Sequence, residues 1–230
     1  MNRGQLVTRV GRIMGMARSS TDSSEEVTYL QDLANEAVLD VLKRTKIHVR
    51  RTTLDLTAGV TDYDLSQQVL RLWSLSDDTG PIVEVPVDDV ALYEDSHVFN
   101  FTGMNMLVIG WEPETGDQLE ALYTPRPTKM TLDAHDPALV TYGLIPEENH
   151  DALINYMCWK AGEMTRDQQS GMGEKFRRLY EGEDGLGSMG TNLGRIKWEV
   201  NRRGATGAPY SRLARAITRS AADLGASNWR

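Results

Sequence analysis

The sequence predicts an α+β fold, in which a helical bundle core carries an inserted antiparallel β-rich region and an extended C-terminal arm. Helix-period apolar patterns flank a middle region whose apolar period shortens toward two. The segment 191–230 holds eight arginines and lysines against two acids, whereas the rest of the chain holds 17 bases and 31 acids. We therefore expect N-terminal core helices over 1–48, a β-rich insertion over 49–128, return helices of the core over 129–190, and a basic C-terminal arm with a short docking helix over 191–230.

Two helices are expected before residue 48. In the first, apolar side chains recur every three or four residues among arginines with no acid, which is typical of a short amphipathic helix. The second is expected to open at Ser23, with Glu26 three residues later completing a capping box. The apolar residues of the first helix are Leu6, Val10, Ile13, Met14 and Ala17, and those of the second are Val27, Leu30, Leu33, Ala34, Ala37, Val38, Val41 and Leu42. These stripes are predicted to face a core or a neighbouring helix.

The β-rich region is predicted from about His48, where Leu54 and Leu56 alternate with polar residues. A turn at Gly59 leads to Tyr63 and the next strand. Several short strands separated by turn residues predict an antiparallel sheet or a small sandwich. Further strands are expected over 69–75, 82–85, 97–101, 104–111 and 118–123, with a short helix over 88–93.

The return helices are predicted to begin near Pro146, because a proline without an N–H suits the first helical position. The acids Glu147, Glu148 and Asp151 would interact favourably with the helix dipole. We expect a break at 170–173 and read the glycines there and later as hinges or helix stops. The apolar residues are Leu153, Ile154, Met157, Cys158, Ala161 and Met164, followed after the break by Phe176, Leu179 and Tyr180.

Composition argues against most enzyme classes. The single cysteine, Cys158, excludes an intrachain disulfide and is predicted to be a buried, inert thiol, so folding inside a cell is expected. No apolar run approaches the roughly 20 residues that span a bilayer, and no signal peptide is recognisable, so a soluble protein is expected. No phosphate-binding loop occurs, and no cofactor or metal is expected. The four histidines, interpreted as surface residues, are His48, His97, His135 and His150.

Pairs of acids are the remaining candidates for catalysis. Glycoside hydrolysis needs two carboxyl groups that face one bond, at roughly 5 to 9.5 Å from each other. Neighbouring residues on a strand or turn point apart, so turn capping and surface charge explain the pairs, and the chain is predicted not to be an enzyme. The pairs are Asp77–Asp78, Asp88–Asp89 and Glu147–Glu148.

Several segments resemble the head-to-tail adaptor (connector) proteins of tailed bacteriophages, over roughly residues 20–185. The resemblance implies a non-enzymatic ring, a dodecamer, that lies in the virion neck beneath the portal and contacts tail or stopper proteins. Its helices would form the ring, its β-rich part would face neighbours or tail components, and genomic DNA would pass through the lumen without sequence-specific contact. The segments are 53–66, 69–72, 113–119, 123–127, 145–146 and the helical pattern 150–180.

In the short-tailed branch of that family, a C-terminal extension wraps the portal ring, which is a role that the basic arm would suit. The arm shows no sustained core pattern before Leu213, where a short docking helix is expected. Aromatic anchors and arginine contacts would offset the entropy lost on ordering. The expected portal contacts are Trp198, Arg202, Arg203, Tyr210, Arg212, Leu213, Arg215, Ile217, Arg219 and Trp229.

Other interpretations of the chain remain open at this point. A basic, glycine-containing tail is also typical of a solvated terminus. Arginines beside Trp198, Tyr210 and Trp229 also suit a nucleic-acid-binding protein, although the acidic body would repel DNA. In a ring, that repulsion would let a duplex slide. A stopper or tail-terminator ring is the nearest structural alternative.

Overall fold

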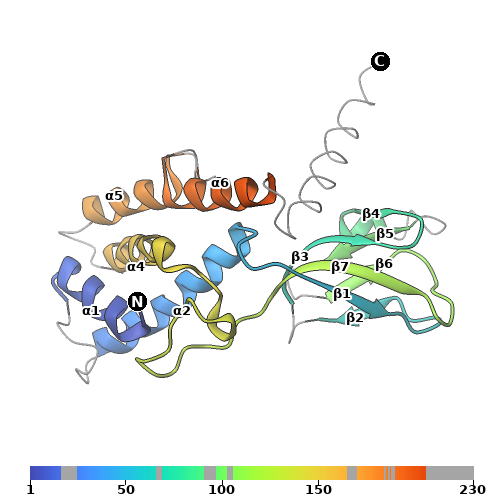
Figure 1. The fold of residues 1–230 in the computed structure, drawn as a ribbon, viewed down its shortest axis with the longest axis horizontal. Coiled ribbons are helices and arrows are strands. Elements are labelled where there is room, and N and C mark those ends of the chain that lie inside the picture. Colours follow the sequence, from blue (N-terminus) through green and yellow to red (C-terminus); the bar gives the residue numbers. More distant parts are fainter. Residues whose placement is uncertain are drawn as a thin grey trace, which may run out of the picture. The chain divides into compact units, whose positions relative to one another are not determined.

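The computed structural model describes residues 1–16, 25–65, 69–90, 97–102, 106–164, 170–183, 185, 187 and 190–205. The chain divides into two compact units (Figure 1). The helical unit comprises 1–47, 130–138 and the chain from 145 onward, and the sheet unit comprises 48–129 and 139–144. The fold is therefore α+β, as predicted.

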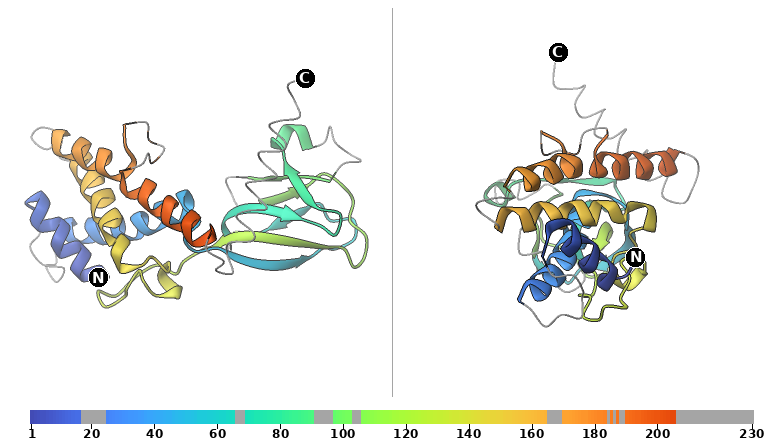
Figure 2. Two further views of the ribbon diagram at one scale, coloured as in Figure 1. Left: turned by 45° about the horizontal axis from the view of Figure 1, so that its top comes forward. Right: turned by 90° about the vertical axis from the view of Figure 1, so that its left-hand side faces the viewer.

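The helical unit is layered around one central helix. Helix α4 packs against α1 and α2 on one side and against α5 and α6 on the other (Figures 1 and 2). The helices α5 and α6 follow one another along the same side of α4. The bounds are Arg3–Met14 for α1, Glu25–Arg44 for α2, His150–Met164 for α4, Ser170–Glu181 for α5 and Asn192–Ala205 for α6.

The two N-terminal helices follow the predicted pattern closely. Helix α1 is capped by Asn2, whose side chain accepts from the Gln5 N–H while the Gln5 side chain accepts from the Asn2 N–H. It ends at Gly15, which adopts a left-handed conformation with φ 67°. All eight apolar residues predicted for the second helix are buried in α2, so that prediction is confirmed. On α1, the prediction that Ile13 belongs to the buried stripe is wrong, because its side chain is 37% exposed. The N-cap proposed for the second helix, Ser23, lies outside the described residues.

A buried arginine fastens the segment 130–138 to α1. Arg3 Nη1 donates to the Met130 carbonyl over 2.9 Å, and Nη2 donates to Asp133 Oδ1 over 2.8 Å. Asn35 on α2 adds a second attachment, since its Oδ1 accepts from the Met130 N–H over 2.7 Å. These contacts place the segment in the helical unit although it precedes α4 by more than ten residues.

Helix α4 follows a 3-10 turn, η3, over Glu147–Asn149, so the turn begins directly after Pro146 and the α-helix three residues later. The predicted apolar face is buried at the five positions that the structure describes: Leu153, Ile154, Met157, Cys158 and Ala161. The Met164 side chain lies outside the described residues.

The predicted break at 170–173 is wrong, because α5 begins at Ser170 and its first turn contains Gly171 and Gly173. A Cβ at Gly173 would lie 3.2 Å from the Trp159 carbonyl oxygen and 3.2 Å from the Gly162 carbonyl carbon. The glycine therefore permits close approach of α5 to α4. The later glycines end α5 as expected, with φ of 86° at Gly182, 68° at Gly185, 77° at Gly187 and 98° at Gly190.

Helix α6 is the largest departure from the sequence prediction, which expected no core pattern before Leu213. Its Leu193 and Ile196 are fully buried, and the Thr191 hydroxyl accepts from the Gly194 N–H over 3.1 Å. Residues 191–205 thus belong to the helical unit. The remaining candidate arm residues, 206–230, lie outside the described part of the chain.

The sheet unit is a curled seven-stranded sheet with the order β1-β7-β3-β4-β5-β6-β2. Its apolar core includes Leu75, Leu107 and Leu119, which are at most 1% exposed. The strands are β1 (Arg50–Asp55), β2 (Asp62–Asp64), β3 (Val69–Ser76), β4 (Pro81–Glu84), β5 (Val98–Phe101), β6 (Met106–Ile109) and β7 (Gln118–Pro125), with the short helices α3 (Val87–Val90) and η2 (Val140–Tyr142).

The sheet is antiparallel at every described pair except one, so the fully antiparallel prediction is wrong there. Strands β4 and β5 run parallel, with Val83 opposite Val98. The connection between them passes through α3 and has more than ten residues, which is the length a parallel crossover needs. Helix α3 begins one residue before the predicted helix 88–93, whose last three residues lie outside the described part.

Candidate interaction surfaces

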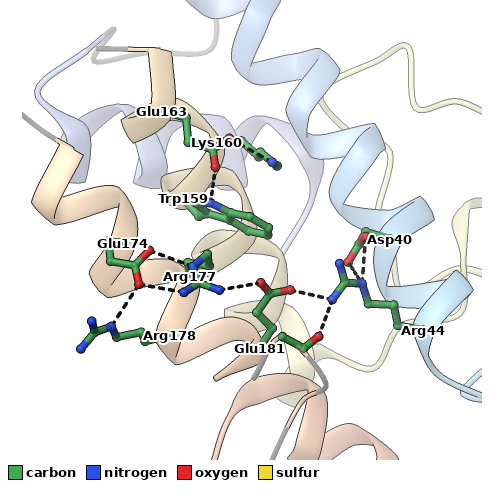
Figure 3. Close-up of polar contacts among 10 residues, drawn as sticks. Asp40, Arg44, Trp159, Lys160, Glu163, Glu174, Arg177, Arg178 and Glu181 are labelled. Atoms are coloured by element: carbon green, nitrogen blue, oxygen red, sulfur yellow. Dashed lines mark hydrogen bonds and ion pairs between the residues drawn. The ribbon is translucent and has the colours of Figure 1, made fainter. Parts of the chain in front are cut away.

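A network of charged side chains joins α2 to α5 (Figure 3). Arg44 Nη1 donates to Glu181 Oε2 over 2.6 Å, and Arg177 Nη1 donates to Glu181 Oε1 over 3.2 Å. The Glu181 side chain is only 7% exposed. Glu174 continues the network outward, since it accepts from Arg177 and Arg178, and these bonds lower the pKa of Glu174 to about 2. Both oxygens of the buried Glu181 therefore have donors, one from Arg44 on α2 and one from Arg177 within α5.

A buried tyrosine makes a second connection between the same helices. The Tyr180 hydroxyl donates to Asp40 Oδ2 over 2.5 Å, and its ring packs edge-on against Tyr156 at 5.4 Å between centroids. Burial, and then the negative charge of Asp40, raise the pKa of Tyr180 far above its usual range. Tyr180 is therefore a neutral donor, and Asp40 also accepts from Arg44 over 3.1 Å. Because the Asp40 carboxylate already has donors in Tyr180 and Arg44, the arrangement is structural.

The outer side of α6 presents a basic and aromatic surface. Arg195, Trp198 and Arg202 are exposed at positions i, i+3 and i+7, so they share one face of the helix, and we call them the α6 surface. Trp198 is 50% exposed, and the Arg202 guanidinium carbon lies 5.3 Å from its ring centroid. On the neighbouring α5, Leu179 is 46% exposed. Exposed tryptophan beside arginine is the residue combination enriched at protein–protein interfaces.

The outer side of α2 presents the opposite charge. Glu25, Thr28, Asp32 and Glu36 are exposed at helical spacing, and we call these four residues the α2 stripe. Burial raises the pKa of the adjacent Tyr29, and the negative charge of Glu36 raises it further. The negative electrostatic potential of this acidic helix face suits a basic partner.

The structure describes two of the ten predicted portal contacts with their side chains. Trp198 and Arg202 are both exposed on α6 and lie together. The Arg203 backbone is helical, but its side chain and the other seven residues lie outside the described part. The sequence reasoning missed the α2 stripe, although the spacing of its acids at i, i+7 and i+11 was a usable signal.

Two of the histidines predicted to lie on the surface are buried, so that prediction is wrong for His48 and His150. His150 Nε2 lies 3.0 Å from the Ile145 carbonyl oxygen, which compensates for its burial. Burial lowers the pKa of both imidazoles. Cys158 is fully buried, as predicted, and burial raises the pKa of its thiol to about 12.

The acidic pair Asp77–Asp78 caps a turn, as expected. The Asp77 carboxylate accepts from the Thr79 N–H and the Gly80 N–H over 2.8 and 2.9 Å and contacts His97, whose ring stacks on Trp111 at 4.5 Å. Within the described ranges, no three His, Cys, Asp or Glu side chains gather closely enough to hold a metal. Of the helices that the structure describes, none combines the length and apolar character needed to cross a membrane.

Comparison of the sequence with known proteins identifies a protein family that matches the chain. A search of the curated proteins finds no match to it. The family model of the SU10 adaptor protein matches residues 1–209, which include both units and all of α6. This match confirms the resemblance to phage adaptor proteins, and it extends to residues outside 20–185. The chain belongs to the SU10 adaptor protein family.

Proposed function

We propose that the chain is a non-enzymatic structural adaptor that forms a ring between the portal and the tail of a phage and helps to retain and pass the packaged genome. The observation that carries this proposal is the family match over residues 1–209. An adaptor of this kind is a virion component that interacts with other phage head or tail proteins, and its place in our account is the neck. The ring is a homo-oligomer, for which we adopt the dodecamer that the resemblance implies.

The charge distribution is consistent with DNA passing through such a ring. The whole chain has a formal net charge of −8. Like charge disfavours tight contact with the phosphate backbone, so a duplex would pass without sequence-specific binding. The helical unit forms the ring in this proposal, and the sheet unit faces neighbouring subunits or tail and stopper proteins.

Portal binding belongs in this proposal to the chain beyond α6. Because residues 191–205 pack in the helical unit, the arm that reaches the portal is 206–230, which begins directly after α6 ends at Ala205. This arm has four arginines against one acid. Its proposed contacts are Tyr210, Arg212, Leu213, Arg215, Ile217, Arg219 and Trp229. Arg203, in the last turn of α6, is a further proposed contact.

Truncation after Ala205 tests the portal assignment. The full chain and the chain ending at Ala205 are compared for capture by the portal protein of the same phage, with thermal unfolding as the check on folding. We expect equal unfolding temperatures and at least tenfold weaker portal capture by the shortened chain, roughly the loss of 1.4 kcal/mol or more. Because α6 stays in place, its buried Leu193 and Ile196 remain covered.

A control separates the aromatic and basic contributions of the arm. Arg215→Gln and Arg219→Gln together remove two charges but leave Tyr210 and Trp229.

Undiminished capture by the truncated chain would overturn the arm assignment. Loss of salt-sensitive DNA binding, with portal capture unchanged, would favour the nucleic-acid-binding alternative. Capture by a tail protein in place of the portal would favour a stopper or terminator ring.

A further inference from the structure

Two oppositely charged surfaces lie on opposite sides of the helical unit. Helix α4 separates the α1–α2 layer from the α5–α6 layer (Figures 1 and 2). The α2 stripe faces outward, because the buried stripe from Val27 to Leu42 occupies the other side of that helix. The α6 surface likewise lies opposite the buried Leu193 and Ile196.

The two helices carry complementary net charge. Helix α2 has five acids and two bases, whereas α6 has four bases and one acid. The two surfaces face outward from opposite layers and do not meet within one chain, although the last turns of α2 and α5 are joined through Arg44 and Glu181. A second copy of the chain, however, presents the matching surface.

The spacing of the residues also matches. Arg195 and Arg202 are seven residues apart, and so are Glu25 and Asp32. Seven residues correspond to about 10 Å along a helix, so both pairs of opposite charges fit the length of one helix–helix contact. Arg195 Nη2 donates to the Glu148 carbonyl over 2.9 Å within the chain, so its other N–H groups would face the partner. Trp198 and Thr28 occupy the equivalent i+3 positions between the charges. The half-exposed indole would therefore be covered at the centre of the contact, with charged pairs at its rim.

We propose that the α6 surface of one subunit binds the α2 stripe of a second copy of the chain. This inference rests on the proposed ring and specifies its contact. Because the two surfaces differ and lie on opposite sides, the contact is heterologous, and repeating it generates a closed ring when the rotation between subunits closes.

A charge exchange tests the contact. The variants are Asp32→Lys, Arg202→Glu, the double variant that carries both changes, and Trp198→Ala. Oligomeric mass is measured by mass photometry over a concentration series at low salt, for the chain alone and after addition of the portal. Asp32→Lys and Arg202→Glu should each weaken self-association at least tenfold, because each places like charges opposite each other. Trp198→Ala should also weaken it, because it removes the indole from the centre of the contact. The double variant should recover to within about threefold of the natural chain.

Matched controls lie elsewhere on the helical unit. Arg12→Glu reverses an exposed arginine on α1, and Leu132→Ala removes a side chain that is 62% exposed. Both should assemble as the natural chain does. Thermal unfolding of every variant identifies any change that acts through folding.

Three outcomes would overturn the inference: single variants that assemble normally, a double variant that is no better than either single one, or a chain that stays monomeric both alone and on the portal. The first two leave the proposed ring intact and remove only this contact. Loss of portal capture with normal self-association would instead count against the proposed function alone.

Discussion

Arg44 and Glu181 are joined by a hydrogen bond of 2.6 Å between Nη1 and Oε2, which ties the last turn of α2 to the last turn of α5 (Figure 3). The same Nη1 also donates to the Gly185 carbonyl over 3.2 Å. One arginine therefore holds both the end of α5 and the chain that leads to α6.

Glu181→Ala should lower the free energy of unfolding by about 2–3 kcal/mol. The change leaves Arg44 and Arg177 without their buried acceptor, and the arginines' partial exposure reduces the cost below the ~3–5 kcal/mol of a fully buried pair. Urea unfolding measures the difference. Glu120→Ala is the control, because its ion pair with Arg51 is about half exposed and should be worth less than about 1 kcal/mol. Equal losses for the two variants would contradict the structural role of Glu181.

Gly173→Ala should destabilise the helical unit, whereas Gly171→Ala should not. A Cβ at Gly173 would press on the backbone of α4, and overpacking of this kind costs about 1–3 kcal/mol. A Cβ at Gly171 would meet nothing within 4 Å, so the greater helix propensity of alanine should stabilise by up to about 1 kcal/mol. Thermal unfolding of the two variants gives opposite shifts in this account. A stabilised Gly173→Ala variant would show that α5 and α4 are not in close contact there.

Asp77 should contribute stability that disappears in acid. Burial acts to raise the pKa of Asp77, but hydrogen bonds from Thr79, His97 and Gly80 outweigh it and lower the pKa to about 2. The contribution is thus fully present above the unfolded value of 3.8 and is lost as the pH falls toward about 2. Asp77→Asn should cost about 1–2 kcal/mol at pH 7, and the difference from the natural chain should shrink between pH 4 and pH 2. Urea unfolding at several pH values checks this, and a difference independent of pH would contradict it.

Cys158 should react with thiol reagents only when the helical unit opens. Its side chain is fully buried, and burial raises the pKa of the thiol to about 12, so little thiolate exists at pH 8. Labelling of the native chain should be at least about a hundredfold slower than labelling in urea. Equal rates in the two conditions would place Cys158 at an accessible surface.

The parts of the fold that depend on local patterns were predictable from the sequence. The eight buried apolar residues of α2 recur from Val27 to Leu42, over about four turns. Glycines predicted the turns between strands where the structure has positive φ, at Gly59, Gly80 and Gly116. Helix α6 was missed because, among its described residues, the buried apolar side chains are Leu193 and Ile196 alone, and two positions make a pattern too short to stand out. The break predicted at 170–173 was wrong because Gly173 serves packing against α4, which is a tertiary property.

The candidate surfaces were predictable only in part. Trp198 and Arg202 could be chosen by residue type, but their common exposed face depends on α6 being a helix. The burial of His150 could not be predicted, since its acceptor Ile145 lies in the loop before α4, where no periodic pattern fixes side-chain direction. The parallel β4–β5 pair likewise depends on how the crossover folds, and not on the alternation within either strand.

Cryo-electron microscopy of the full chain mixed with the portal of the same phage tests the central claim most directly. The proposed adaptor role predicts a symmetric ring coaxial with the portal, with density for residues 206–230 along the portal surface. A portal map without an attached ring, under conditions in which the chain is folded and in excess, would contradict it.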